Sequence, residues 1–179
     1  MRGRPGRWVV VAAAALLLTA AAPDAAAHPP RDLGRLLVDY YGTPAGYRRE
    51  RRDVLRWHRT TRNGCAAFAS TALRHIGVEV PRDRAIDGWG ISRITFALSA
   101  YLEKELHWGR VLDAGELRPG DLVFTTGYPD HVFVFQRWAD RSRRIARALD
   151  NRSFAGARPL FPAAGSDVSA FAYALRPAR

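Results

Sequence analysis

The chain has 179 residues, of which 47% are hydrophobic, and it carries a formal net charge of +11. This length suffices for one domain with a hydrophobic core and leaves little room for a second, and the hydrophobic content excludes general disorder. The basic charge favours contact with anionic surfaces, but no helix-turn-helix, zinc-finger or RNA-binding signature accompanies it, so we expect no nucleic-acid partner.

Residues 1–27 have the layout of a secretory signal peptide. Positive residues come first, an apolar run follows over 8–22, and three alanines at 25–27 precede His28. The run is shorter than the roughly 20 apolar residues that span a bilayer, which disfavours a membrane anchor. We therefore expect a secreted or periplasmic protein without a stable membrane span, whose mature part begins at His28.

The first half of the mature chain is expected to be helical. Apolar residues at helical spacing predict a helix over 31–41, and an arginine-dense stretch over 47–59 predicts an exposed second helix. Two further helices are predicted over 65–76 and over 92–106, with Ser92 as the N-cap of the latter. A polar loop is expected between these two, over residues 81–90.

The second half changes to the pattern of strands. Short β-branched and aromatic segments predict strands over residues 121–126, 131–138, 144–149 and 168–175. Helices followed by an antiparallel meander predict the α+β fold class, with a single domain over residues 28–179 that we expect to be a monomer.

Cys65 is the only cysteine of the chain, so it cannot form an internal disulfide. A free thiol in an exported protein favours a chemical role, although a buried and inert cysteine is the alternative. Cys65 follows the turn dipeptide Asn63-Gly64 and begins a predicted helix. Free N–H groups at a helix N-terminus lower the pKa of a thiol and can bind the oxyanion that forms when a thiolate attacks a carbonyl.

A nucleophilic thiol also needs a base, and His131 is the best placed histidine. It begins an apolar strand after a turn, whereas His75 lies about 15 Å along the helix from Cys65. A hairpin with the next strand would bring the end of that strand, at Asp150 or Asn151, beside His131. Side chains alternate along a strand, so only one of these two would orient the imidazole, and the register is open.

Three local strings resemble the NlpC-like cell-wall cysteine peptidases and their CHAP-type amidase relatives. They are NGCAAFAS at 63–70, LRPGDLVF at 117–124 and DHVFVF at 130–135, with a weaker fourth match, YGTP, at 41–44. The resemblance covers about residues 38–151, most of the mature chain.

The resemblance implies a papain-like fold, with the nucleophile at a helix N-terminus packed on a small antiparallel sheet. It implies a thiol hydrolase that cleaves an amide bond, most simply in peptidoglycan, through Cys65, His131 and either Asp150 or Asn151. The oxyanion would lie on the backbone N–H groups of Cys65 and Ala66. No organic cofactor is expected, and no metal either, because the sequence contains no HExxH or CxxC motif.

The chain departs from the family pattern at several positions. Gly64 replaces the usual acid before the cysteine, Ala66 the usual serine after it, and Ala45 a tyrosine for which Tyr47 is a weak substitute. These departures favour one alternative, a catalytically inactive papain-like domain that binds wall material or another anionic envelope polymer. A Cys-dependent acyl or peptidyl transferase is the other alternative.

Several remaining features are expected to be structural rather than functional. The arginine-rich stretch 48–52 is typical of a solvated helix face, and Asp121 is typical of a turn held by its own side chain. Trp89 and Trp108 are expected in the core rather than on a binding surface.

Overall fold

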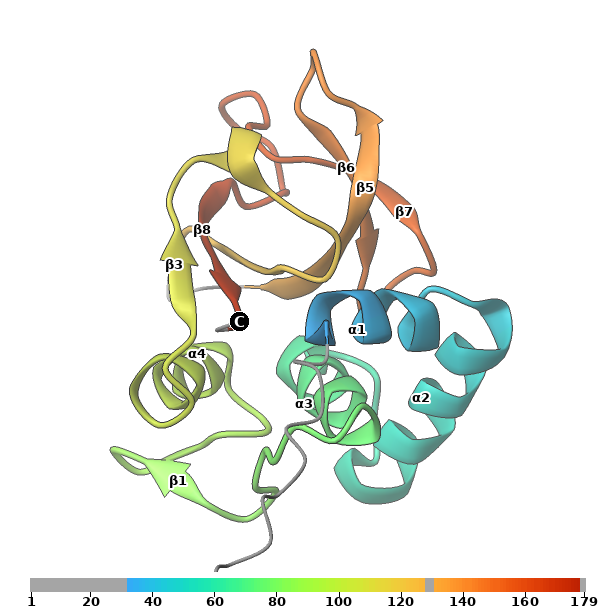
Figure 1. Cartoon of the computed structure of the whole chain (residues 1–179), viewed down its shortest axis with the longest axis vertical. Helices are drawn as coiled ribbons and strands as arrows, with labels where there is room; N and C mark the ends of the chain where they lie inside the picture. Colours follow the sequence, from blue (N-terminus) through green and yellow to red (C-terminus); the bar gives the residue numbers. More distant parts are fainter. Residues whose placement is uncertain (1–31, 128–130, 178–179) are drawn as a thin grey trace, which may run out of the picture.

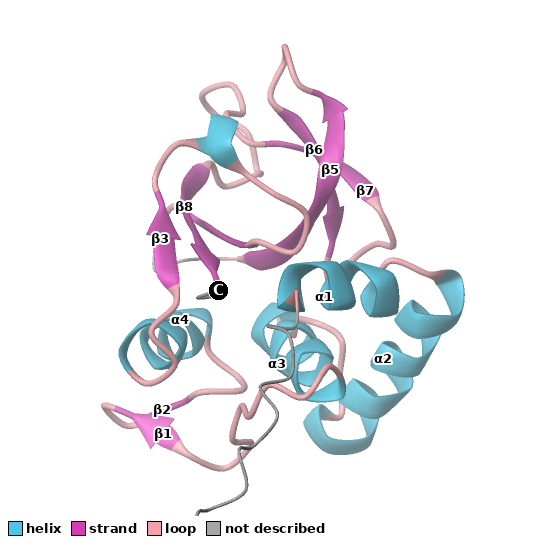
Figure 2. Ribbon diagram, viewed as in Figure 1, coloured by secondary structure: helices cyan, strands magenta, loops and turns pink. Residues whose placement is uncertain are grey.

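A computed structural model describes residues 32–127 and 131–177. Over these ranges, four α-helices lie on one side of a six-stranded antiparallel sheet (Figures 1 and 2). The helices come before most of the strands along the chain, so the predicted α+β class is confirmed. The predicted signal peptide, residues 1–27, lies outside the described residues.

The first three helices form the layer that carries Cys65. They are α1 (Leu33–Tyr41), α2 (Pro44–His58) and α3 (Cys65–His75). Thr43 caps α2 by accepting a hydrogen bond from the backbone N–H of Gly46. Helix α3 is buried throughout its first nine residues and packs against α1, α2 and the sheet, so the core fixes where this helix begins.

Helix α4 (Thr95–Lys104) begins later than the sequence predicts. The expectation that Ser92 caps it is wrong, because the hydroxyl of Ser92 donates to the carbonyl of Pro81 at 2.8 Å and accepts a hydrogen bond from Arg74 at 2.9 Å. Ser92 therefore ties the segment before α4 to α3, and Ile94 takes the N-cap position.

The predicted polar loop over 81–90 contains a short hairpin of β1 (Ala85–Ile86) and β2 (Trp89–Gly90). Trp89 is 51% exposed, so its expected place in the core is wrong, whereas Trp108 is buried as expected. Strands of two residues are too short to show the alternation by which strands are recognised in a sequence.

The main sheet has the strand order β3-β8-β4-β5-β6-β7, with every pair antiparallel. Its strands are β3 (Gly109–Val111), β4 (Leu122–Thr125), β5 (Val132–Asp140), β6 (Ile145–Leu149), β7 (Gly156–Pro159) and β8 (Phe171–Arg176), and a 3-10 turn, η1 (Ala114–Glu116), precedes β4. The four predicted strands are confirmed. The short strands β3 and β7, at the two edges of the sheet, were not predicted.

Both faces of the sheet are buried. On β5, Val132 and Val134 pack against the helical layer, while Phe133 and Phe135 belong to a second cluster on the opposite face. The sheet is strongly curved (Figure 1). The first residues of β5, next to His131, are therefore held by packing on both faces of the sheet.

The helical layer and the sheet come into close contact where the backbones of Gly34 and Gly120 touch; we call this contact the glycine joint. A Cβ atom on Gly120 would lie 2.1 Å from the Cα of Gly34 on α1, and Gly120 also has a φ of +91°. Next to this joint, Asp121 accepts a hydrogen bond from the backbone N–H of Arg118 at 2.8 Å and pairs with Arg176 at 2.8 Å. The structural role expected for Asp121 is confirmed.

Candidate active site

Cys65 is the first residue of α3, and its side chain is 9% exposed. Asn63 before it has a left-handed φ of 52°, and the N-cap residue Gly64 has no side chain that could satisfy the first N–H groups of the helix. The start of α3 therefore keeps free donors beside the sulfur, as the sequence predicts. One of them, the N–H of Ala66, contributes to lowering the pKa of the thiol.

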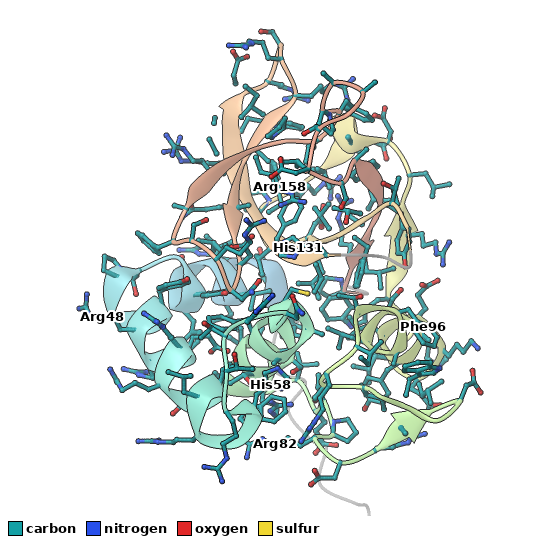
Figure 3. The ribbon with its side chains drawn as sticks, turned by 180° about the vertical axis from the view of Figure 1, so that it is seen from behind. Arg48, His58, Arg82, Phe96, His131 and Arg158 are labelled. Atoms are coloured by element: carbon teal, nitrogen blue, oxygen red, sulfur yellow. The ribbon has the colours of Figure 1, made fainter. Side chains whose placement is uncertain are left out.

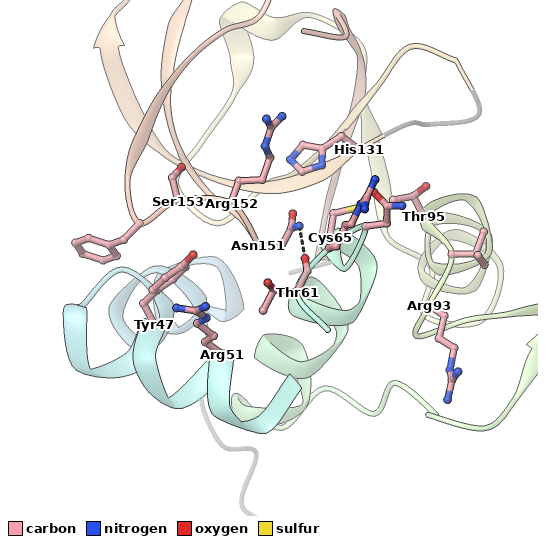
Figure 4. A pocket seen from close by; sticks show the side chains of 14 residues that line it. Tyr47, Arg51, Thr61, Cys65, Arg93, Thr95, His131, Asn151, Arg152 and Ser153 are labelled. Atoms are coloured by element: carbon pink, nitrogen blue, oxygen red, sulfur yellow. Dashed lines mark hydrogen bonds between the residues drawn. The ribbon is translucent and has the colours of Figure 1, made fainter. Parts of the chain in front are cut away.

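His131 and Asp150 reach the site from neighbouring strands of the sheet. His131 precedes β5, Asp150 follows β6, and the two strands pair antiparallel with Val134 opposite Leu149. The Nε2 atom of His131 lies 2.8 Å from Oδ2 of Asp150, and both side chains are largely buried. This contact leaves Nδ1 as the ring nitrogen available to Cys65, toward which the imidazole lies (Figure 4).

The pKa values of Cys65 and His131 shift in the directions that activate a thiol. Burial would raise the pKa of Cys65, but the hydrogen bond and charge of His131 and the N–H groups of Val132 and Ala66 outweigh it, and the pKa is lowered. Burial would lower the pKa of His131, but its hydrogen bonds to Asp150 and Cys65 raise it. A lowered thiol pKa and a raised imidazole pKa favour a thiolate beside an imidazolium.

The structure separates the two candidates for orienting the imidazole. The second oxygen of Asp150, Oδ1, accepts hydrogen bonds from the backbone N–H groups of Arg152 and Ser153, so the carboxylate that contacts His131 is held at both oxygens. Asn151 does not contact His131. Its amide donates to the carbonyl of Thr61, in the loop before α3, at 2.8 Å (Figure 4).

A cleft of about 910 Å³ opens over Cys65 and His131. Tyr47 and Phe154 form one wall of it, with their ring centroids 5.8 Å apart. Tyr47 thus lines the same cleft as Cys65, although Ala45 occupies the position where the family pattern has tyrosine. Helical spacing could not have indicated this, because residues two apart on a helix, such as positions 45 and 47 of α2, point to nearly opposite sides.

Four arginines line the same cleft and were not predicted as site residues: Arg51, Arg62, Arg93 and Arg152. The first of them belongs to the stretch expected to be a solvated face. No single motif could have indicated the group, because its members come from four separate segments: α2, the loop before α3, the segment before α4 and the turn after β6.

His131 is the only histidine among the described residues that line the cleft, although a Cβ atom on Gly64 would lie 3.6 Å from the ring of His58. His75 is 3.1 Å from Glu50 and 3.1 Å from Asp53 at the junction of α2 and α3, as its distance from Cys65 along the helix predicts. Within residues 32–127 and 131–177, no three acidic, histidine or cysteine side chains gather so that they could hold a metal ion.

No family model, curated protein or solved structure matches this chain. In the part of the chain that the structure describes, no helix is long and apolar enough to cross a membrane.

Proposed function

We propose that this protein is a thiol hydrolase of the papain-like type that cleaves amide bonds, with Cys65 as nucleophile, His131 as general base and acid, and Asp150 as the residue that orients the imidazole. The contact that carries the proposal is the buried hydrogen bond from His131 Nε2 to Asp150 at 2.8 Å, on a ring that lies beside a thiol at a helix N-terminus.

Each step of the reaction has a residue in reach. His131 takes the proton of Cys65, and the thiolate attacks the carbonyl carbon of the amide. The oxyanion that forms accepts hydrogen bonds from the free backbone N–H groups of Cys65 and Ala66. His131 then protonates the leaving amine, and water releases the acyl group from the sulfur. Asp150 stabilises the imidazolium and keeps the ring in one orientation.

The sequence resemblance makes peptidoglycan the first substrate to test, as a stem-peptide bond or the amide between sugar and peptide. The proposal includes membership of the papain-like family, which the sequence strings support. It also includes an extracytoplasmic location, which the predicted signal peptide supports.

The test is the pH dependence of Cys65 alkylation by iodoacetamide, on protein that begins at His28. We expect a midpoint below the ordinary thiol pKa of about 8.5, because His131 and the helix N-terminus stabilise the thiolate. The substitution His131→Asn should shift the midpoint back to that value and slow alkylation at pH 7 by about tenfold or more.

His107→Asn is the matched control. His107 is exposed, lies outside the cleft and has a left-handed φ of 55°, which asparagine tolerates. An ordinary midpoint in the wild-type protein would exclude catalysis and leave the inactive wall-binding domain. If the midpoint is low, release of free amino groups from purified peptidoglycan, compared with Cys65→Ser, tests the substrate.

A further inference from the structure

The cleft over Cys65 is lined by positive charge without a matching negative charge. Among the residues that the structure describes, the lining contains four arginines and no aspartate or glutamate. The one carboxylate close by, Asp150, is 5% exposed and already engaged by His131 and by two backbone N–H groups. The open face of the cleft therefore presents a positive field to anything that enters it.

None of the four cleft arginines forms an ion pair with a described residue. The arginines that form ion pairs with described residues are others, namely Arg35, Arg56, Arg84, Arg110, Arg144 and Arg176. All four cleft arginines are exposed, and one of them, Arg93, rests over the ring of Trp57 at 5.7 Å. The guanidinium groups of Arg51 and Arg152 make no hydrogen bond within the described chain, so they are available to a ligand.

Arg51 and Arg152 belong to the same half of the cleft. Both lie on the side of Cys65 where Tyr47 and Ser153 are found, whereas Arg93 lies on the opposite side (Figure 4). Their segments are held independently, the first by helix α2 and the second by the tight turn around the carboxylate of Asp150. Arg51 and Arg152 line one half of the cleft from the helical layer and from the turn after β6. Such a pair suits an anionic group, because arginine binds carboxylate and phosphate through paired N–H donors.

We propose that the acyl donor carries a carboxylate or phosphate group that binds between Arg51 and Arg152, on the Tyr47 side of the bond to be cleaved. This inference rests on the proposed function, since it names the chemical class of molecule that reaches the thiol. It makes the cleft selective for acidic peptides or phosphorylated polymers over neutral ones, and the ring of Tyr47 would pack against the donor beside the charge.

The first test compares two alkylating reagents that differ in charge, iodoacetate and iodoacetamide. In both reactions the thiolate of Cys65 forms a sulfur–carbon bond and displaces iodide, so the ratio of the two rates on one protein reports the field in the cleft and not the reactivity of the thiol. We expect the double variant Arg51→Gln/Arg152→Gln to lower the iodoacetate-to-iodoacetamide ratio about fivefold at low salt, since a unit charge at about 7 Å in water changes a rate two- to threefold.

The matched control is Arg48→Gln/Arg82→Gln, which removes the same charge. Arg48 lies on the same helix as Arg51, and Arg82 lies over the same Trp57 ring as Arg93, but neither lines the cleft, and Figure 3 shows both apart from His131. The control ratio should stay within twofold of wild type. Equal ratios in the two double variants would overturn the inference, while a wild-type thiol that titrates at the ordinary pKa would instead overturn the proposed function.

A second test measures protection of Cys65 from iodoacetamide at constant ionic strength. The probes are the peptide Ac-Glu-Gly-Glu-amide, its neutral counterpart Ac-Gln-Gly-Gln-amide, and inorganic phosphate. Protection by the acidic peptide alone assigns a carboxylate, and protection by phosphate alone assigns a phosphate; both should disappear in Arg51→Gln/Arg152→Gln. Equal protection by the acidic and neutral peptides, with none by phosphate, would contradict the inference.

Discussion

The site consists of single side chains whose surroundings decide their chemistry. Cys65 and His131 could be predicted from the sequence because each is marked locally: a turn and a helix start for the thiol, a turn and an apolar strand for the imidazole. The choice between Asp150 and Asn151 could not, because the pairing of β5 with β6 shifts register twice, between Phe135 and Arg137 and again near Trp138. A bulge moves every later side chain relative to its partner strand, and sequence periodicity does not show it.

Asp150→Asn and Asn151→Ala should therefore differ in their effect on the thiol. Asp150 raises the pKa of His131 through a buried hydrogen bond, so losing its charge should slow iodoacetamide alkylation at pH 7 by about tenfold and reduce stability by about 1–3 kcal/mol. Asn151→Ala removes only the contact with Thr61 and should slow alkylation by less than threefold. A larger loss in the Asn151 variant would reverse the assignment of the two residues.

At the scale of elements, prediction succeeded where the repeat is long and failed where it is short. The helices over 33–41, 44–58 and 65–75 contain two to four turns each, enough for the 3.6-residue spacing to be recognised. The strands β1, β2, β3 and β7 contain two to four residues and, unlike the equally short but apolar and buried β4, have no composition that separates a strand from a loop. Their pairing is decided by neighbours that are distant in sequence.

The junction of α2 with α3 should make the stability of the protein depend on pH. Glu50 is fully buried and its pKa is raised from 4.5 to about 7, chiefly by burial, while its hydrogen bond raises the pKa of His75. Between pH 4.5 and about 7, Glu50 is protonated in the folded protein and ionised in the unfolded chain. The free energy of unfolding should therefore fall as the pH rises through this range, by about 2–3 kcal/mol. Glu50→Gln should flatten this decline.

Urea unfolding between pH 5 and 8 measures the effect. Glu105→Gln is the comparison, because its carboxylate is 45% exposed and pairs with Arg84 at the surface, so its profile should follow that of the wild type. An equally steep decline in Glu50→Gln would show that another group, not Glu50, is responsible.

Considered as a whole, the molecule is two layers that share one hydrophobic core, and the site lies across the boundary between them. Cys65 belongs to the helical layer, whereas His131 and Asp150 belong to the sheet (Figure 2). The cleft and its arginines could not be foreseen from the sequence for the same reason: they exist only once segments far apart in the chain have docked.

The glycine joint between the layers should be sensitive to a single methyl group. A Cβ on Gly120 would collide with the backbone of Gly34 in addition to straining a left-handed residue, so Gly120→Ala should cost about 3 kcal/mol of unfolding free energy. Gly109→Ala is the control, since no atom lies within 4 Å of its added methyl group and the change should stay within about 0.5 kcal/mol. Denaturant unfolding of both variants checks this, and equal losses would exclude the joint as a critical contact.

Because the nucleophile and its base come from different layers, the chain cannot possess an activated cysteine before the layers dock. An unfolded or partly folded molecule holds only an ordinary thiol, with the imidazole and its carboxylate elsewhere. Rapid alkylation of Cys65 at low pH therefore reports the last stage of folding. In a refolding experiment, this reactivity should develop together with the final burial of aromatic residues, not with the earlier formation of helices. The docking of the two layers is thus the step that turns an ordinary thiol into a reactive one.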